Sequence, residues 1–427
     1  MRMMHRHTRI LSAATLLAFT VAACGTEGTP TSSASPSPIP RAEHVSTAVG
    51  EPSGATVEES GRTPRLAITH EGGVIVLDAV TLTQVGEFPL EGFTRLNPVG
   101  DERHLMVTEG DTFRLLDLGG YSLPHGDHAH HHSTEPTLTD LTWPSKHPGH
   151  VVVHDGRTVM YGDGDGKVRS FDSDALREGA TELPPTDTRT ERTPHHGVAV
   201  EREDGSVVAT VGTEDERSGI VIRDAKGAKL ASSDDCPGVH GEAAAQGGVL
   251  VFGCEDGLLL VKDDEITKVD APDGYGRIGN QAGSDESPFV LGDYKTDPDA
   301  ELERPTRVSV TDTRDGSLQL VDLPASYSFR SLARGADGEG VVLGTDGRLH
   351  VIDMAKGEVA DSIDVIGEWE EPLEWQEPRP TVHVQDGTVY VTEPSTKTLH
   401  MVDLHSGEVV NSGVLPVVPN EIEGTLG

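Results

Sequence analysis

The chain has 427 residues, with 34 Lys and Arg against 71 Asp and Glu, so its formal net charge is −37 at pH 7. A surface of this charge repels nucleic-acid phosphates and anionic lipid headgroups, which excludes nucleic acid and direct membrane adsorption. Aromatic residues make up only 4%, whereas Gly (49) and Pro (27) are abundant. Frequent turns are therefore expected, and a helical bundle is disfavoured.

The N-terminus is predicted to be an export signal. Three arginines in the first nine residues precede an apolar run from 10 to 23, which is too short to span a membrane comfortably. The run ends in the sequence VAACG at residues 21–25, which resembles a bacterial lipobox. We therefore predict a lipoprotein signal peptide over residues 1–23 and acylation of Cys24, which would make a lipid anchor the only membrane contact. An ordinary signal peptide cleaved near Cys24 is the alternative.

The next segment, residues 24–61, is rich in Ser, Thr, Pro and Gly. It cannot bury a core, so it is predicted to be a disordered tether. A single globular domain is expected over residues 62–420.

Two further cysteines, Cys236 and Cys254, remain in the predicted mature chain. An even pair outside the cytoplasm predicts a disulfide. The competing interpretation is a thiolate metal ligand, because Cys236 lies four residues before His240.

The body of the chain repeats one pattern. A Val-rich strand, an Asp-Gly turn and a second strand ending in an acidic residue recur about every 45 residues, for example over 155–172, 247–263, 338–360 and 386–410. This period, with β-branched strands and no helical periodicity, predicts an all-β fold, a β-propeller. Eight blades are favoured and seven are possible. The first repeat lacks an innermost strand, which residues 421–424 are expected to supply.

The segment 122–140 stands out because it holds five histidines within eight positions. Imidazole suits Zn²⁺, Cu²⁺ and Ni²⁺, so this segment is predicted to be an exposed, flexible, metal-binding loop. Its candidate ligands are His125, His128, His130, His131 and His132.

A tighter metal site is expected at the central channel, where the innermost strands of three consecutive blades begin. Each of these three positions carries histidine, and a carboxylate follows in the third, so a tetrahedral N/O site is predicted. Its candidate ligands are His147 or His150, His196 (preferred to its neighbour His195), His240 and Glu242.

Three acidic segments carry a weaker signal. The sequence Asp163-Gly164-Asp165-Gly166 invites a calcium interpretation, but equivalent turns elsewhere in the repeat make a hairpin turn the better one. The segments 296–305 and 369–378 are either docking surfaces or solvated loops, and solvated loops are favoured.

The His-rich segment, Pro194-His195-His196-Gly197 and the sequence CPGVHGEA at 236–243 together resemble the AztD-type zinc metallochaperones. The resemblance implies an exported β-propeller that binds zinc in preference to copper or nickel. It also implies a partner, the solute-binding protein of a zinc ABC transporter. The lipobox departs from a freely diffusing chaperone.

The resulting hypothesis is an extracytoplasmic, lipid-anchored zinc chaperone and not an enzyme. In it the His-rich loop gathers Zn²⁺ and the channel site holds the ion more tightly. Two alternatives stay open: a metal-dependent propeller hydrolase or lactonase that uses the same histidines, and a surface propeller that binds protein partners. The sequence contains none of the Gly-x-Ser-x-Gly, His-Glu-x-x-His or phosphate-loop motifs.

Overall fold

A computed structural model of the protein describes residues 43–44 and 55–427. The predicted signal peptide (1–23), Cys24 and most of the predicted tether (24–61) lie outside these residues. In the described part the regular structure is β-strand throughout, apart from one short 3-10 helix at Ser173–Leu176. Within the same part, no helix combines the length and the apolar character that crossing a lipid bilayer requires.

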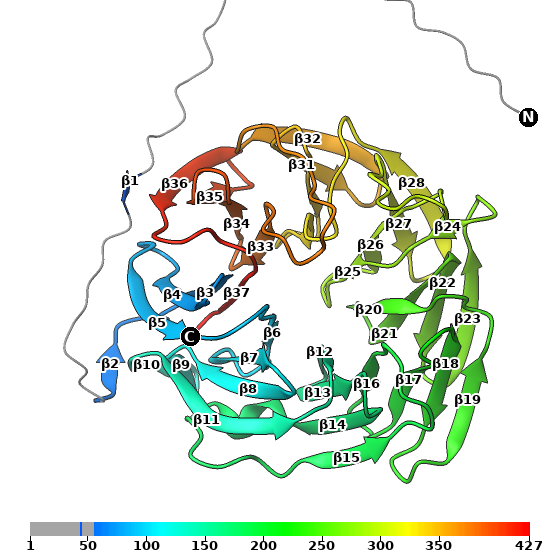
Figure 1. Ribbon diagram of the computed structural model, residues 1–427, viewed down its shortest axis with the longest axis horizontal. Helices are drawn as coiled ribbons and strands as arrows, with labels where there is room; N and C mark the ends of the chain where they lie inside the picture. Colours follow the sequence, from blue (N-terminus) through cyan, green and yellow to red (C-terminus); the bar gives the residue numbers. More distant parts are fainter. Residues whose placement is uncertain (1–42, 45–54) are drawn as a thin grey trace, which may run out of the picture. The chain divides into compact units, whose positions relative to one another are not determined.

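The strands form antiparallel sheets that follow one another around a ring (Figure 1). Among the described residues, eight sheets have four or five strands each, and one smaller sheet has three. This arrangement confirms the predicted all-β propeller.

Each of the eight larger sheets extends from an innermost strand at the channel to an outermost strand at the rim. In this order, the first four sheets contain β37 (Ile422–Thr425), β3 (Arg65–His70), β4 (Gly73–Asp78) and β5 (Gln84–Pro89); β6 (Leu96–Pro98), β7 (His104–Glu109), β8 (Thr112–Asp117) and β11 (Thr137–Pro144); β12 (Pro148–His154), β13 (Arg157–Gly162), β14 (Lys167–Asp172) and β15 (Asp187–Thr190); β16 (Ala199–Glu201), β17 (Val207–Gly212), β18 (Arg217–Arg223) and β19 (Lys229–Ser233).

The next four contain β20 (His240–Ala245), β21 (Val249–Cys254), β22 (Asp256–Lys262) and β23 (Glu265–Asp270), with β24 (Gly276–Arg277) beside β22; β25 (Gln281–Ala282), β26 (Phe289–Asp293), β27 (Arg307–Asp312) and β28 (Ser317–Asp322); β29 (Leu332–Arg334), β30 (Gly340–Leu343), β31 (Arg348–Asp353) and β32 (Glu358–Asp364); β33 (Val382–Gln385), β34 (Thr388–Glu393), β35 (Thr398–Asp403) and β36 (Glu408–Val414), with β1 (Glu43–His44) beside β36.

The core lies between neighbouring sheets. Middle strands such as β21 are buried along their whole length, because both faces of each sheet pack against another sheet. Outermost strands such as β23 instead alternate exposed and partly buried side chains. The alternating hydrophobic pattern in the sequence therefore belongs to the rim of the ring, and the continuous Val-rich runs belong to its interior.

The ring closes through its C-terminal strand. β37 pairs antiparallel with β3, from Arg65 opposite Thr425 to Ile68 opposite Ile422. The expectation that residues 421–424 supply the missing innermost strand is confirmed, and this strand lies just beyond the expected domain end at residue 420.

Because one four-stranded unit is repeated around the ring axis, all innermost strands begin at the same end of the central channel. We call the end at which β6, β12, β16, β20, β25, β29, β33 and β37 begin the upper face, and the opposite end the lower face.

The His-rich segment is not the flexible loop that the sequence predicted. Its residues form a hairpin of β9 (Gly120–His125) and β10 (His128–Ser133), and β2 (Val57–Glu59) adds a third strand. The turn of two residues places Gly126 at φ 64°, the left-handed region that the first position of a type II′ turn requires. A polar segment can be ordered without a core of its own when its backbone groups are paired on both sides.

Candidate metal centre

Three imidazoles meet at the upper face, one from each of three consecutive sheets. His150 belongs to β12, His196 to the loop before β16, and His240 is the first residue of β20. The Nε2 atom of His196 lies 3.4 Å from His150 Nε2 and 3.1 Å from His240 Nε2. The ligand atoms of all three lie within 4.8 Å of one another. We call these residues the His triad.

Irregularities in the innermost strands aim two of the three side chains. The pairing of β12 with β13 shifts between Pro148 and Val151, which places His150 in a bulge. A second shift, between His240 and Glu242, is made by Gly241, whose φ of 71° favours glycine. Bulges redirect side chains that a regular strand would leave on its alternating faces.

Hydrogen bonds on the far side of two rings determine which nitrogen carries the proton. His240 Nδ1 lies 2.6 Å from the Gly279 carbonyl oxygen, which can only accept, so Nδ1 donates. His196 Nδ1 lies 2.5 Å from the Asp163 carboxylate and donates likewise. When both rings are neutral, each Nε2 therefore carries a lone pair, and the two lone pairs face each other at 3.1 Å, an arrangement that a cation between them would stabilise.

The spacing of these nitrogens fits zinc. At a Zn–N distance of about 2.0–2.1 Å, two ligands of a tetrahedral site are about 3.3–3.4 Å apart. The two separations that involve His196, 3.1 and 3.4 Å, lie close to this value, and the third pair lies within 4.8 Å.

Two of the three imidazoles, His150 and His240, have lowered pKa values. Burial, together with the charges of the neighbouring histidines, holds the pKa of His150 well below its usual 6.5. Burial lowers the pKa of His240 to about 4, against the opposing effect of its hydrogen bond to Gly279. These two side chains are therefore deprotonated at neutral pH, which is the state that binds metal.

Asp163 is a residue of this centre that sequence reasoning missed. It lies in the turn between β13 and β14, which the sequence presented as one acidic hairpin turn among several. The Asp163 side chain can approach the triad only because residue 149 is glycine, since a Cβ atom at that position would clash with Asp163 Oδ1. In the sequence, the one feature that pointed to this contact was the glycine directly before His150.

The other predicted channel residues lie outside the triad. His147 is exposed, has φ 49° and bonds through its backbone N–H to Asp111. Glu242 follows the bulge, and burial raises its pKa to about 7. His195 is buried between Thr193 and Thr210 and acts as a structural histidine.

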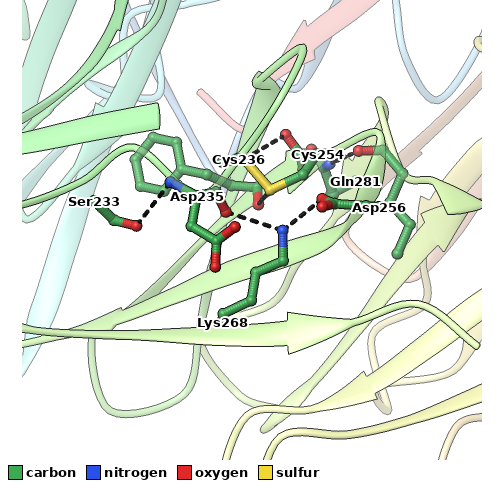
Figure 2. Close-up of a disulfide and its surroundings, with 10 residues drawn as sticks. Ser233, Asp235, Cys236, Cys254, Asp256, Lys268 and Gln281 are labelled. Atoms are coloured by element: carbon green, nitrogen blue, oxygen red, sulfur yellow. Dashed lines mark hydrogen bonds and ion pairs between the residues drawn. A yellow bond between two sulfur atoms is a disulfide. The ribbon is translucent and has the colours of Figure 1, made fainter. Parts of the chain in front are cut away.

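A disulfide holds the loop that leads into His240 (Figure 2). The predicted pairing of Cys236 with Cys254 is confirmed, and both residues are buried. Lys268 donates to the Asp235 carbonyl oxygen at 2.9 Å and pairs with Asp256, which ties both ends of the bridge to β23. A thiolate ligand is ruled out in this state, because both sulfur atoms are consumed by the bond.

A second histidine cluster lies on the hairpin. His125 and His128 face each other across the two strands, and His130 lies diagonally, so the three rings share one exposed face. The remaining two predicted ligands have other partners. His131 Nδ1 bonds Ser122 Oγ at 2.7 Å, and His132 stacks on Tyr121. We call His125, His128 and His130 the hairpin cluster.

The two clusters lie at opposite ends of the propeller. The hairpin leaves β8 at Asp117, on the lower face, whereas the start of β8 lies beside the loop of His147 on the upper face. A strand of six residues spans roughly 20 Å. The hairpin cluster and the His triad are therefore two separate candidate sites on opposite faces of the ring.

Comparison with known proteins gives a consistent picture. No protein-family model matches the chain. The curated zinc chaperone AztD of Citrobacter koseri is 28% identical over 350 residues, which cover 79% of this chain and 80% of the relative. A crystal structure of Citrobacter koseri AztD has a TM-score of 0.75 and 25% identity, covering 86% of this chain and 98% of that chain. Apo AztD from the same organism has a TM-score of 0.73 and 23% identity, with the same coverage. The predicted resemblance to AztD-type proteins is confirmed.

Proposed function

We propose that this protein is a zinc chaperone that holds Zn²⁺ in the His triad and passes it to the solute-binding protein of a zinc ABC transporter. The observation that carries the proposal is the convergence of the His196 and His240 Nε2 lone pairs at 3.1 Å. The similarity to a protein named as a zinc chaperone supports zinc as the cargo.

The triad supplies three nitrogen ligands and leaves the fourth position of a tetrahedral ion open. A ligand from a docked recipient can enter at that position, after which the imidazoles leave one by one. The ion thus moves by ligand exchange and is never released into solvent. A cavity of about 360 Å³, whose lining includes His196, Glu216, Arg217 and Glu255, lies beside the triad and offers room for such a ligand.

The hairpin cluster is proposed as a second and weaker zinc site. The side chains of His128 and His130 are 56% and 44% exposed, so water competes for the ion and no buried partner holds the rings in place. Because the hairpin lies on the lower face, each cluster loads independently.

The location of the protein is part of this proposal. Acylation of Cys24 and the tether would hold the propeller outside the cytoplasmic membrane, within reach of a transporter. An oxidising compartment also agrees with the disulfide between Cys236 and Cys254.

Equilibrium dialysis against Zn²⁺, with protein purified without an affinity tag, tests the assignment. We expect one tight and one weaker ion per wild-type chain. His196→Ala/His240→Ala should lose the tight ion alone, and His125→Ala/His128→Ala/His130→Ala the weaker one alone. His405→Ala, an exposed histidine outside both clusters, is the control. Unchanged tight binding in His196→Ala/His240→Ala would refute the triad as the zinc site.

A metal-dependent hydrolase is the second candidate function. Three histidines with an open fourth position also describe catalytic zinc sites, in which the metal activates a bound water. Turnover of ester or lactone substrates by the zinc-loaded protein, lost in His196→Ala/His240→Ala, would favour it over the chaperone.

A further inference from the structure

The upper face carries an apolar ridge in addition to the His triad. Leu373 and Trp375, in the loop between β32 and β33, are 62% and 50% exposed. Trp375 is the one aromatic among the large apolar side chains left exposed in residues 55–427. Phe93, from the loop before β6, packs edge-on against it with 5.0 Å between ring centroids. An exposed aromatic cluster is typical of a binding surface.

Buried hydrogen bonds and an ion pair fix the conformation of the loop between β32 and β33, which carries this ridge. The guanidinium of Arg379 pairs with the Glu371 carboxylate at 2.8 Å, and both side chains are buried. Arg379 also donates to the Glu374 carbonyl oxygen at 2.7 Å, and Asn420 donates to that of Gln376 at 2.9 Å. A buried ion pair is costly unless it is fully hydrogen-bonded, so its use here indicates a loop with one defined shape.

The same loop separates two hollows. On one side, a cavity of about 200 Å³ is lined by apolar groups that include Leu302, Tyr327, Phe329, Leu373 and Trp375. On the other side, a cavity of about 400 Å³ is lined by Phe93, Glu374 and Glu377 among others.

The insertion at 296–305 forms a wall of the first hollow. Arg304 from this insertion donates to the Glu371 carbonyl oxygen at 3.0 Å. The two acidic segments that the sequence singled out thus meet in space.

The ridge shares its face with the His triad. Phe93 lies three residues before β6, and the sheet that starts with β6 directly precedes the sheet that carries His150 in the ring. Both β6 and β33 begin on the upper face, as do the strands that carry the triad. A protein bound on the ridge would therefore lie over the mouth of the channel that the triad occupies.

The negative charge around the ridge indicates what kind of protein would bind there. The surrounding exposed side chains include the loop carboxylates Glu368, Glu374 and Glu377, whereas Glu370 pairs with Arg304 and Lys295 lines the first hollow. In a symmetric dimer through this face, two acidic rims would meet, and the chain as a whole carries −37. The complementary partner has an apolar centre with Lys or Arg around it.

We propose that Leu373 and Trp375 form the docking surface for the protein that receives zinc, which presents an apolar knob ringed by basic side chains. This inference rests on the proposed function, because it names the surface through which that transfer takes place. Docking there places the recipient on the same face of the ring as the triad.

Stopped-flow zinc transfer tests the inference, with the zinc-loaded full chain and the zinc-free solute-binding protein of the organism's zinc ABC transporter. Trp375→Ala and, separately, Leu373→Ala should lower the second-order transfer rate at least tenfold while leaving zinc affinity unchanged. Leu230→Ala, a leucine 45% exposed on β19, should transfer at the wild-type rate. Glu374→Gln/Glu377→Gln should weaken the salt dependence of the rate.

Transfer by Trp375→Ala and Leu373→Ala at the wild-type rate would overturn the docking surface and leave the chaperone function intact. Failure of the wild-type chain to bind zinc would instead overturn the function. A wild-type dimer in sedimentation that Trp375→Ala dissociates would assign the ridge to self-association and refute the inference.

Discussion

Asp163 contacts one of the clustered imidazoles from a turn in the preceding sheet. Its carboxylate, 2.5 Å from His196 Nδ1, determines the tautomer of that ring and raises the basicity of the opposite nitrogen. Its neighbour Asp165, two residues away, pairs with Lys167 instead. Two chemically equal residues in one turn thus have different roles, because only one of them faces the triad.

Asp163→Asn should weaken zinc binding by the triad about 10- to 100-fold, because a neutral amide no longer polarises the His196 ring. Competition with a zinc chelator measures the affinity. Asp165→Asn is the matched control and should bind as the wild type does. Equal affinities for the two variants would show that Asp163 does not support the site.

His104 is a titratable residue in the core and belongs to neither histidine cluster. Burial alone would lower its pKa, but the hydrogen bond to Asp101 at 2.6 Å and the nearby carboxylate of Asp117 at 3.6 Å raise the pKa to about 9. Since this value lies above the unfolded value of 6.5, the stabilisation is complete below pH 6.5 and is lost as pH rises through 9.

The free energy of unfolding should therefore decrease by about 3 kcal/mol between pH 6 and pH 10, as judged by urea denaturation in the presence of a chelator. His104→Gln should be less stable at pH 6 and should lose most of this slope. The same slope in both proteins would contradict the assignment.

At the level of elements, the site depends on breaks in regular pairing. Gly241 lies between His240 and Glu242, and an added Cβ atom would lie 2.5 Å from Gln281 Oε1 and 2.9 Å from the Gly279 carbonyl oxygen. That carbonyl is the one that orients His240. The bulge at Gly241 and the loop that contains Gly279 are thus in close contact, which leaves no room for a side chain at residue 241.

Gly241→Ala should weaken zinc binding at least tenfold, because the clash moves the Gly279 carbonyl away from His240. Gly247→Ala is a close control, since Gly247 has φ 80° and no atom within 4 Å of an added Cβ. Both variants should lose about 1 kcal/mol of stability from the left-handed backbone, and dialysis should separate them. Equal zinc binding by the two would show that the bulge does not position His240.

At the level of the whole molecule, ring closure couples the chain ends. Ile422 on β37 is buried in one core with Leu66, Ile68 and Tyr390, so the first and last sheets share their hydrophobic contacts. Every other sheet depends on this closure, because each one packs against two neighbours.

Ile422→Asp should destabilise the protein by several kcal/mol, since it places a charge in that core and detaches β37 from β3. Thermal unfolding followed by circular dichroism measures the effect. Ile422→Val, which keeps the apolar contact, should cost only about 1 kcal/mol. Similar melting temperatures for the two variants would contradict closure by this strand.

The sequence by itself determined the propeller, the closing strand and the disulfide, because these follow from local patterns. Strand periodicity, the missing first strand and the pair Cys236 and Cys254 can all be read along the chain. It also pointed to His150, His196 and His240 as candidates, since repeat position places histidines of neighbouring sheets at one end of a channel.

Only the tertiary structure decided which candidates meet. Bulges at His150 and Gly241 break the alternation from which side-chain direction is predicted, so His147 and Glu242 could not be excluded from the sequence. The role of Asp163 depends on a contact across sheets, which no local pattern records. Likewise, the His-rich hairpin lies on the lower face because it follows the end of β8 that is farther from the triad. The separation between the hairpin cluster and the triad follows from the direction of β8 in the folded ring and cannot be read from the sequence.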